Sequence, residues 1–262
     1  SKIPRLIIPI RRYVPGYNTD MQRLDSHSQN FLRSPRLVKE LIGHSTIKKS
    51  DTVLDIGAGS GVISSALASR SNKVIAYELD PRMVQKLRDN LAKFDNVTVV
   101  QQDFLQAELP NEPYKIFANI PFHLSSPILK KLTESPRRPR AIYLIVQKQF
   151  ANKLLIDRPG FTGMLGAQIA PLYAARVRRR LQKTDYWPAP AVDTVFIELK
   201  RHDQQIIAED RLAAYRDFIA DCFADPKIFT KMPLDKVGAV GKRPSELSTG
   251  EWVDLFKLQQ KY

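Results

Sequence analysis

Residues 52–61 read TVLDIGAGSG, where a short apolar run passes directly into a glycine-rich turn. The apolar run predicts a buried strand, and the apolar positions of the VISSAL stretch at 62–67 predict a helix after the turn. Glycine lets a backbone approach a ligand closely, and the first turn of a helix presents unpaired N–H groups. This stretch therefore predicts a strand–turn–helix corner that binds a nucleotide.

The same alternation continues on both sides of this corner. Later apolar runs predict further strands at 73–77, 97–100, 116–118 and 141–146. Helical spacing of apolar residues occurs at 37–42, 83–91 and 127–132. Strands that alternate with helices of this length form a mostly parallel sheet with helices on both faces, so we predict an α/β fold.

The pattern changes after residue 160. Two segments, 174–183 and 192–200, flank the sequence YWPAP and predict an antiparallel strand pair. From about residue 203 the spacing is purely helical, with one apolar face formed by Leu212, Tyr215, Phe218, Ile219 and Cys222. We therefore divide the chain into a basic N-terminal arm at 1–24, a catalytic domain at 25–201 and a helical C-terminal domain at 202–262.

Composition limits the classes of partner. Lys and Arg total 41 against 27 Asp and Glu, and the formal charge of +14 favours a polyanionic partner. Cys222 is the single cysteine, so we expect neither an internal disulfide nor a zinc site. No apolar run approaches the ~20 residues of a membrane-spanning helix, and no apolar stretch follows the arginine pair at 11–12. We expect a cytoplasmic monomer that binds no metal and no membrane.

The glycine spacing separates two cofactors. Gly57, Gly59 and Gly61 read G-x-G-x-G, whereas a dinucleotide turn has G-x-G-x-x-G to seat a pyrophosphate. Asp55, in front of the turn, is poorly placed for a pyrophosphate but suits a sulfonium or ammonium group. Glu78 ends the next predicted strand, where a carboxylate accepts hydrogen bonds from ribose hydroxyls. These residues favour S-adenosylmethionine over a nicotinamide dinucleotide.

Two later loops carry polar residues at the ends of predicted strands. Asp103 is a candidate acceptor for the exocyclic amine of the cofactor's adenine, with a helix cap as the alternative. Residues 119–122 read NIPF. Carbonyl oxygens of the Asn119 side chain and of the main chain near Ile120 can accept both hydrogens of a base amine, which favours its pyramidal, attacking form. Phe122 offers a face on which the target base stacks, so the tetrapeptide predicts methylation of a base amine.

Together these residues resemble a known family. The strings SQNFL at 28–32, DIGAGSG at 55–61 and NIPF at 119–122, with Glu78 and Asp103, resemble the ribosomal RNA adenine N6-methyltransferases. Further strings resemble the erythromycin-resistance (Erm) branch of that superfamily: HSQNF at 27–31, YKIF at 114–117, IYLIV at 142–146 and KIFTK at 227–231. The resemblance extends from about residue 26 to 260.

The resemblance implies a Rossmann-like methyltransferase domain with a small all-helical C-terminal domain. It implies transfer of methyl from S-adenosylmethionine to an adenine N6 in 23S ribosomal RNA, and with it resistance to macrolides, lincosamides and streptogramin B. Carried over by position, it implies that Asn119 and Phe122 contact the target base as catalytic residues. The residues that it implies for the cofactor are Asn30, Leu32, Gly57, Glu78, Asp103 and Asn119.

Two positions depart from the family pattern. Phe122 stands where Tyr is usual, which keeps the stacking face but loses a hydroxyl. His123 stands where Asn is common, and we interpret it as a wall of the site rather than a proton acceptor. These substitutions leave open whether one methyl group is added or two.

The RNA must be held while an adenine leaves its stack, at a cost of about a few kcal/mol. Arg137, Arg138 and Arg140 follow the helix of the catalytic loop and are our candidates for phosphate contacts, together with the arm at 1–24. Similar basic clusters occur at 48–49, 176–180 and 242–243, although a run of charge is often only a solvated face.

Three other functions compete with this prediction. A small-subunit (16S) ribosomal RNA adenine dimethyltransferase shares the core motifs and differs in the C-terminal strings. A non-enzymatic nucleic-acid-binding relative would have lost cofactor residues, whereas the glycine turn, Glu78, Asp103 and Asn119 are intact here. A DNA adenine methyltransferase needs a separate recognition domain, for which the 61 helical residues at 202–262 leave little room.

Overall fold

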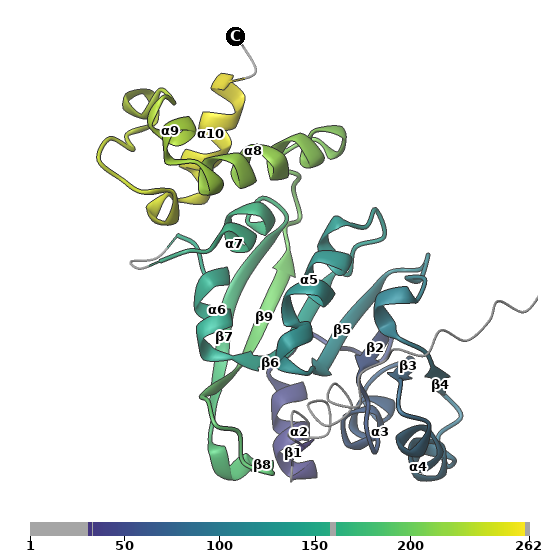
Figure 1. Ribbon diagram of the computed structural model, residues 1–262. Helices are drawn as coiled ribbons and strands as arrows, with labels where there is room; N and C mark the ends of the chain where they lie inside the picture. The colour runs from purple at the N-terminus through teal and green to yellow at the C-terminus, as the bar shows by residue number, and fades with distance from the viewer. Residues whose placement is uncertain (1–30, 33, 158–160, 260–262) are drawn as a thin grey trace, which may run out of the picture.

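A seven-stranded sheet forms the centre of the computed structural model, which describes residues 31–32, 34–157 and 161–259 (Figure 1). In spatial order its strands are β4 (Val97–Gln101), β3 (Lys73–Glu78), β2 (Thr52–Ile56), β5 (Tyr114–Asn119), β6 (Ala141–Gln147), β9 (Thr194–Arg201) and β7 (Tyr173–Leu181). The pairs among β4, β3, β2, β5 and β6 are parallel, whereas β9 is antiparallel to both β6 and β7. The predicted α/β fold and the predicted antiparallel strand pair are both confirmed.

Helices cover both faces of the sheet. The helices α2 (Pro35–Gly43), α3 (Val62–Ala68) and α4 (Pro81–Leu91) pack on one face, and α5 (Ser125–Glu134), α6 (Lys148–Leu154) and α7 (Met164–Ile169) pack on the other. Neighbouring residues of β2 point to opposite sides, so Val53 joins the α2–α3 core while Leu54 joins the α5 core. Coverage on both sides explains why this strand reads as a continuous apolar run.

A second, two-stranded sheet joins distant parts of the chain. Strand β1 (Phe31–Leu32) pairs antiparallel with β8 (Tyr186–Trp187), which lies in the connection between β7 and β9. In Figure 1 both strands lie at the lower end of the molecule, away from the C-terminal helices. Sequence periodicity did not predict this pairing, because two-residue strands carry too few positions to show a period.

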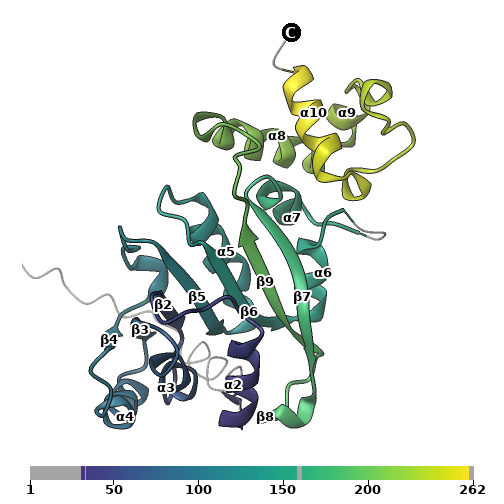
Figure 2. The ribbon, with the colours of Figure 1, turned by 180° about the vertical axis from the view of Figure 1, so that it is seen from behind.

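The C-terminal helices α8 (Leu212–Ala224), α9 (Pro226–Thr230) and α10 (Thr249–Gln259) lie at the upper end (Figures 1 and 2). The predicted face of α8 is buried, including Tyr215 and Cys222. The predicted start of α10 is also present, because Ser248 and Glu251 exchange side-chain hydrogen bonds with each other's backbone N–H. Residues of α8 and α10 belong to the same apolar core as the α5 side of the sheet, so this helical region packs as a continuation of the larger unit.

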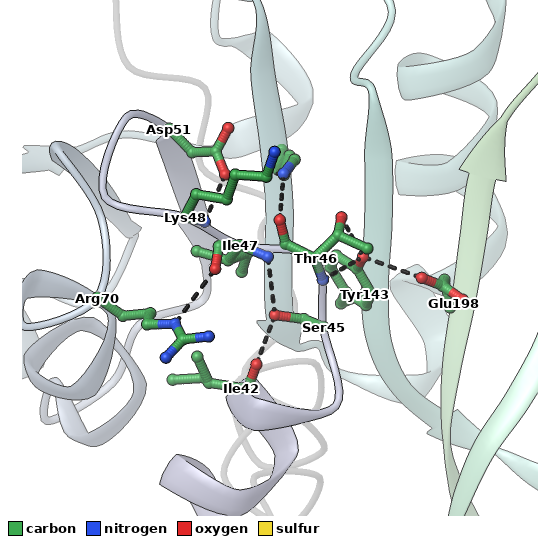
Figure 3. Close-up of polar contacts among 10 residues, drawn as sticks. Ile42, Ser45, Thr46, Ile47, Lys48, Asp51, Arg70, Tyr143 and Glu198 are labelled. Atoms are coloured by element: carbon green, nitrogen blue, oxygen red, sulfur yellow. Dashed lines mark hydrogen bonds and ion pairs between the residues drawn. The ribbon is translucent and has the colours of Figure 1, made fainter. Parts of the chain in front are cut away.

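Buried polar contacts fix the loop between α2 and β2 (Figure 3). The Tyr143 hydroxyl accepts the Thr46 N–H at 2.9 Å and donates to Glu198, the residue opposite it on β9, at 3.0 Å. Lys115 Nζ donates to Thr46 O at 2.6 Å and to the Asp51 carboxylate at 2.7 Å. These bonds connect the loop that enters β2 to residues of β5, β6 and β9.

Candidate active site

The glycine turn is built from backbone conformations that side chains disfavour. Gly57, Gly59 and Gly61 have φ values of +70°, +55° and +90°, all in the left-handed region. A Cβ on Gly61 would also lie 2.8 Å from Leu87 Cδ1 of α4, so this glycine is needed both for its φ and for helix packing. Gly57 is exposed at the edge of the sheet. The turn therefore presents backbone to solvent at the start of α3, as the sequence predicts.

The carboxylate of Glu78 holds this turn from the end of β3. Its Oε2 accepts the Gly59 N–H at 2.8 Å, and its Oε1 accepts the N–H groups of Leu79 and Asp80 at 2.8 and 3.0 Å. Glu78 lies where the sequence placed a ribose-binding carboxylate, and its Oε2, which accepts one N–H, has a further lone pair for a ligand. The side chain thus shapes the turn as well as facing the candidate cofactor site.

Asp55 lies beneath the turn and is completely buried. Ser64 Oγ donates to its Oδ2 at 2.6 Å, while its Oδ1 has no hydrogen-bond partner among the described residues. Burial raises the pKa of Asp55 to about 7, the Ser64 hydrogen bond opposes that shift, and the charge of Glu78 adds to it. An unsatisfied carboxylate oxygen at this depth is complementary to a positively charged ligand. The donor set of the turn therefore fits S-adenosylmethionine, whose sulfonium and ammonium groups are cationic.

Two residues at the neighbouring strand ends complete this side of the site. Asp103 follows β4, and its carboxylate accepts the Leu105 N–H at 2.9 Å, so the helix cap considered as an alternative is present. Leu79 directly follows Glu78 and is 61% exposed. This exposed leucine lies between the loops of Glu78 and Asp103, where its side chain offers an apolar contact for a purine ring. Sequence analysis missed Leu79, although an apolar residue outside a predicted strand was the available signal.

The NIPF tetrapeptide leaves the C-terminal end of β5. Asn119 is the last residue of the strand, and Phe122 begins a short 3₁₀ helix, η2 (Phe122–Leu124), that leads into α5. Asn119 and Phe122 are half-buried, whereas His123 is exposed. A Cβ built on Gly57 would lie 3.8 Å from Pro121 Cδ, so the tetrapeptide and the glycine turn are in contact distance.

Topology explains why these two segments meet. Strand β2 lies between β3 and β5, and the chain moves outward from β2 in both directions. The carboxyl ends of strands on either side of such a reversal form a crevice in which α/β proteins bind ligands. Gly57 follows one of these strands and Asn119 ends the other. The structure thus brings together the predicted cofactor residues Gly57, Glu78 and Asp103 and the predicted catalytic residues Asn119 and Phe122 along one edge.

The two remaining cofactor candidates, Asn30 and Leu32, precede helix α2 in the sequence. Leu32 is buried in β1, next to Tyr186 of β8. Asn30 and the basic arm at 1–24 lie outside the described residues.

The predicted arginine cluster lies elsewhere. Arg137, Arg138 and Arg140 precede β6, at the amino ends of the parallel strands, because α5 carries the chain back across the sheet. The length of β5, about 17 Å, separates them from Asn119. The Arg138 side chain is only 3% exposed, and it donates to Thr133 O and to both oxygens of Glu209. Because the Arg138 guanidinium is used in these internal contacts, we no longer propose that it binds an RNA phosphate. Arg137 and Arg140 are exposed at this opposite edge of the sheet.

Among the described residues, no group of three or more His, Cys, Asp and Glu side chains is arranged to hold a metal ion. A search of the same residues for a helix long and apolar enough to cross a membrane found none.

The fold is that of an α/β methyltransferase with a Rossmann-like sheet. A family model described as ribosomal RNA adenine dimethylase matches residues 22–240. The chain belongs to this family, so it is a ribosomal RNA adenine methyltransferase that uses S-adenosylmethionine.

Individual relatives agree with this assignment. Ribosomal RNA small subunit methyltransferase A from Streptococcus agalactiae is 33% identical over 193 residues, covering 70% of this chain and 67% of its own length. An rRNA adenine N-6-methyltransferase from Limosilactobacillus reuteri is 32% identical over 193 residues, covering 73% and 77%. The crystal structure of the 23S rRNA methyltransferase ErmE superposes with a TM-score of 0.76 at 27% identity, covering 87% of this chain and 98% of that one. A dimethyladenosine transferase from Plasmodium falciparum gives the same TM-score at 20% identity and shows the shared fold.

Proposed function

We propose that this enzyme methylates the N6 of adenine in small-subunit (16S) ribosomal RNA. The relatives named small subunit methyltransferase A, at 31–33% identity, support this substrate in preference to the 23S RNA that the sequence strings favour. In the structure, the proposal is supported by the short separation of the NIPF loop and the glycine turn, where a Cβ built on Gly57 would lie 3.8 Å from Pro121 Cδ; this arrangement fits an amine-binding loop beside a site for the methyl donor.

Asn119 and the adjacent main chain orient the target amine. The N6 lone pair of adenine is delocalised into the ring, so the amine is a weak nucleophile until its nitrogen becomes pyramidal. Carbonyl oxygens that accept both N–H hydrogens stabilise that geometry more than the planar one and lower the barrier selectively. Phe122 stacks against the flipped base, a contact that is worth about 1–3 kcal/mol for an aromatic side chain. The proton leaves after the methyl group arrives, so no strong general base is required.

The cofactor supplies an electrophilic methyl group carried on sulfonium. The glycine turn at Gly57 lets the backbone come close to the cofactor. Glu78 offers an acceptor for the ribose hydroxyls, and Asp103 offers an acceptor for the amine of the cofactor's adenine. The buried carboxyl of Asp55, whose Oδ1 has no hydrogen-bond partner among the described residues, offers a further acceptor near the turn. Leu32 and Asn30 are proposed cofactor contacts on the basis of the family resemblance alone.

A second candidate substrate is 23S ribosomal RNA, with resistance to macrolides, lincosamides and streptogramin B as its consequence. The match to ErmE over 98% of that chain favours it, as do the Erm-like strings at 114–117 and 142–146. Phe122 in place of the usual tyrosine leaves the number of methyl groups to experiment.

The two substrates are separated by one experiment. The full-length enzyme is incubated with S-adenosylmethionine carrying a labelled methyl group and, in parallel, with assembled small subunits that lack N6-methyladenine and with protein-free 23S RNA. Label in the small subunit alone supports the proposal, and primer extension then maps the adenine. Label in 23S RNA alone overturns it in favour of the second candidate.

A further inference from the structure

Lys148 is a partly exposed cation beside the NIPF loop, and the chemistry proposed above does not use it. It begins α6 and directly follows β6, the strand next to β5. In the register of these two parallel strands Asn119 lies beside Ile145, three residues before Lys148. With about 3.3 Å between residues of a strand and about 4.8 Å between strands, the Cα atoms of Asn119 and Lys148 are about 11 Å apart. Lys148 therefore lies at the same edge of the sheet as the NIPF loop.

The backbone at Lys148 is firmly placed. Its N–H donates to Asp193 O at 2.9 Å, which extends the pairing of β6 with β9 by one residue beyond Gln147 and Thr194. Ala151, about one turn later in α6, is completely buried. The start of α6 is therefore fixed at this edge of the sheet, and movement of Lys148 is confined to its flexible stem and ammonium group.

The ion pair that the Lys148 ammonium group makes within the protein is weak. Lys148 Nζ lies 3.8 Å from Asp193 Oδ2, which is longer than a hydrogen bond, and the two side chains are 42% and 69% exposed. Exposed pairs of this kind contribute little to stability, because water screens the charges and both side chains must be ordered. Lys148 can therefore exchange Asp193 for another anion at little cost.

The strand ends on the two sides of Asn119 differ in charge. On one side, β2, β3 and β4 carry carboxylates at or near their ends, and these suit a cationic cofactor: Asp55, Glu78 and Asp103. On the other side, β6 is followed by Lys148. With the cofactor on the acidic side, the side of β6 is left for the nucleotide that carries the target adenine. That nucleotide is anionic, and a cation at the end of β6 is complementary to it.

We infer that the Lys148 ammonium group binds a phosphate that flanks the target adenine and holds the nucleotide while its base lies against Phe122. This inference rests on the proposed function, because it needs an RNA substrate with a flipped adenine. The flexible lysine stem and the ribose of the bound nucleotide together bridge the distance from Asn119 to the phosphate. A phosphate contact fixes the position of the nucleotide without reading its base, so Lys148 contributes affinity and alignment rather than base specificity.

The test uses the full chain and a synthetic RNA hairpin that carries the mapped target adenine. Lys148→Ala binds this hairpin roughly tenfold more weakly, as expected for loss of one hydrogen bond to a charged group. The slope of log affinity against log salt concentration decreases in magnitude by about 1, because one phosphate contact is lost. Lys148→Arg keeps most of the affinity. Lys200→Ala removes an exposed lysine opposite Ala141, at the other edge of the sheet, and is the matched control with the wild-type slope.

Two comparisons separate a phosphate contact from a structural role. Asp193→Asn removes the partner of Lys148 within the protein, so a structural ion pair predicts equal losses of RNA affinity in both variants, whereas a phosphate contact predicts a loss only in Lys148→Ala. Hairpins in which one phosphate at a time is an uncharged methylphosphonate locate the contact, because wild type and Lys148→Ala bind equally when the contacted phosphate is replaced.

An unchanged salt slope for Lys148→Ala, an equal loss in Asp193→Asn, or a difference that persists on every methylphosphonate hairpin overturns the inference. Methylation of the unmodified hairpin by the wild type keeps that failure distinct from failure of the proposed function.

Discussion

The Glu78 carboxylate accepts the backbone N–H of Gly59 at 2.8 Å, so the residue predicted to bind the ribose also holds the glycine turn in shape. If Glu78 also binds the ribose, as we propose, cofactor affinity and turn geometry depend on the same side chain.

Glu78→Gln tests this dual role. The amide keeps the size of the side chain but loses its charge and replaces one acceptor oxygen with a donor, which faces backbone N–H groups. We expect S-adenosylmethionine to bind at least about tenfold more weakly by calorimetry, since hydrogen bonds to charged groups are worth ~1.5–3 kcal/mol. Glu112→Gln, at an exposed position by the amino ends of β2 and β3, is the matched control. If Glu78→Gln and the wild type bound S-adenosylmethionine with equal affinity, the proposed contact between Glu78 and the cofactor would be wrong.

Asp55 makes stability of the cofactor-free protein depend on pH. Its folded pKa of about 7 lies above the ordinary value of 3.8, so the folded state holds the proton more tightly than the unfolded state. Its contribution to stability is full below about pH 3.8 and is lost as pH rises through about 7. Thermal unfolding between about pH 5 and pH 8 shows a decline in the wild type that is weaker in Asp55→Asn. The exposed Asp193→Asn control keeps the wild-type slope, and a parallel decline in Asp55→Asn would contradict this account.

The NIPF loop is tested by separating turnover from binding. Asn119→Ala lowers kcat by at least about 100-fold because the amide orients the nitrogen in the transition state, while cofactor affinity stays within about threefold. Phe122→Ala mainly raises the KM for RNA, and Phe122→Tyr is tolerated because the stacking face remains. His123→Ala, the exposed neighbour, changes either parameter only slightly. Single-turnover methylation and calorimetry measure the two effects, and wild-type turnover by Asn119→Ala would refute the role of the loop.

Arg138 is expected to affect folding rather than RNA binding. Arg138→Ala removes donors from Thr133 O and Glu209 and loses the packing of a buried side chain, which costs about 2 kcal/mol. The melting temperature falls by roughly 5 °C, as measured by calorimetry. Arg140→Ala leaves the melting temperature unchanged because its side chain is exposed at the same loop. A stable Arg138→Ala protein with weakened RNA affinity would restore the original interpretation of this cluster.

Local patterns predicted the strands and helices well, because β2, β5 and β6 are buried runs and α8 has one continuous apolar face. They also placed Gly57, Glu78 and Asn119 at one edge, since parallel strands end together. The sequence did not show that the arginines at 137–140 lie at the opposite edge of the sheet from Asn119, because their position depends on the direction of α5 rather than on their distance in sequence from the loop.

Other features depend on long-range contacts that no local period shows. The pairing of β1 with β8 joins residues more than 150 positions apart, and the Arg138–Glu209 contact spans 71 positions. The protonation of Asp55 follows from the depth at which the helices bury it. The exposure of Leu79 and Trp187 is likewise a property of the folded surface.

The most direct test of the central claim is mass spectrometry of nucleosides from ribosomal RNA treated with wild-type enzyme or with Asn119→Ala. We expect the wild type to add one or two methyl groups to adenine N6 and the variant, which still binds the cofactor, to add almost none. Equal N6-methyladenine from both proteins, or a methyl group on any atom other than adenine N6, would contradict the role assigned to the loop at the end of β5.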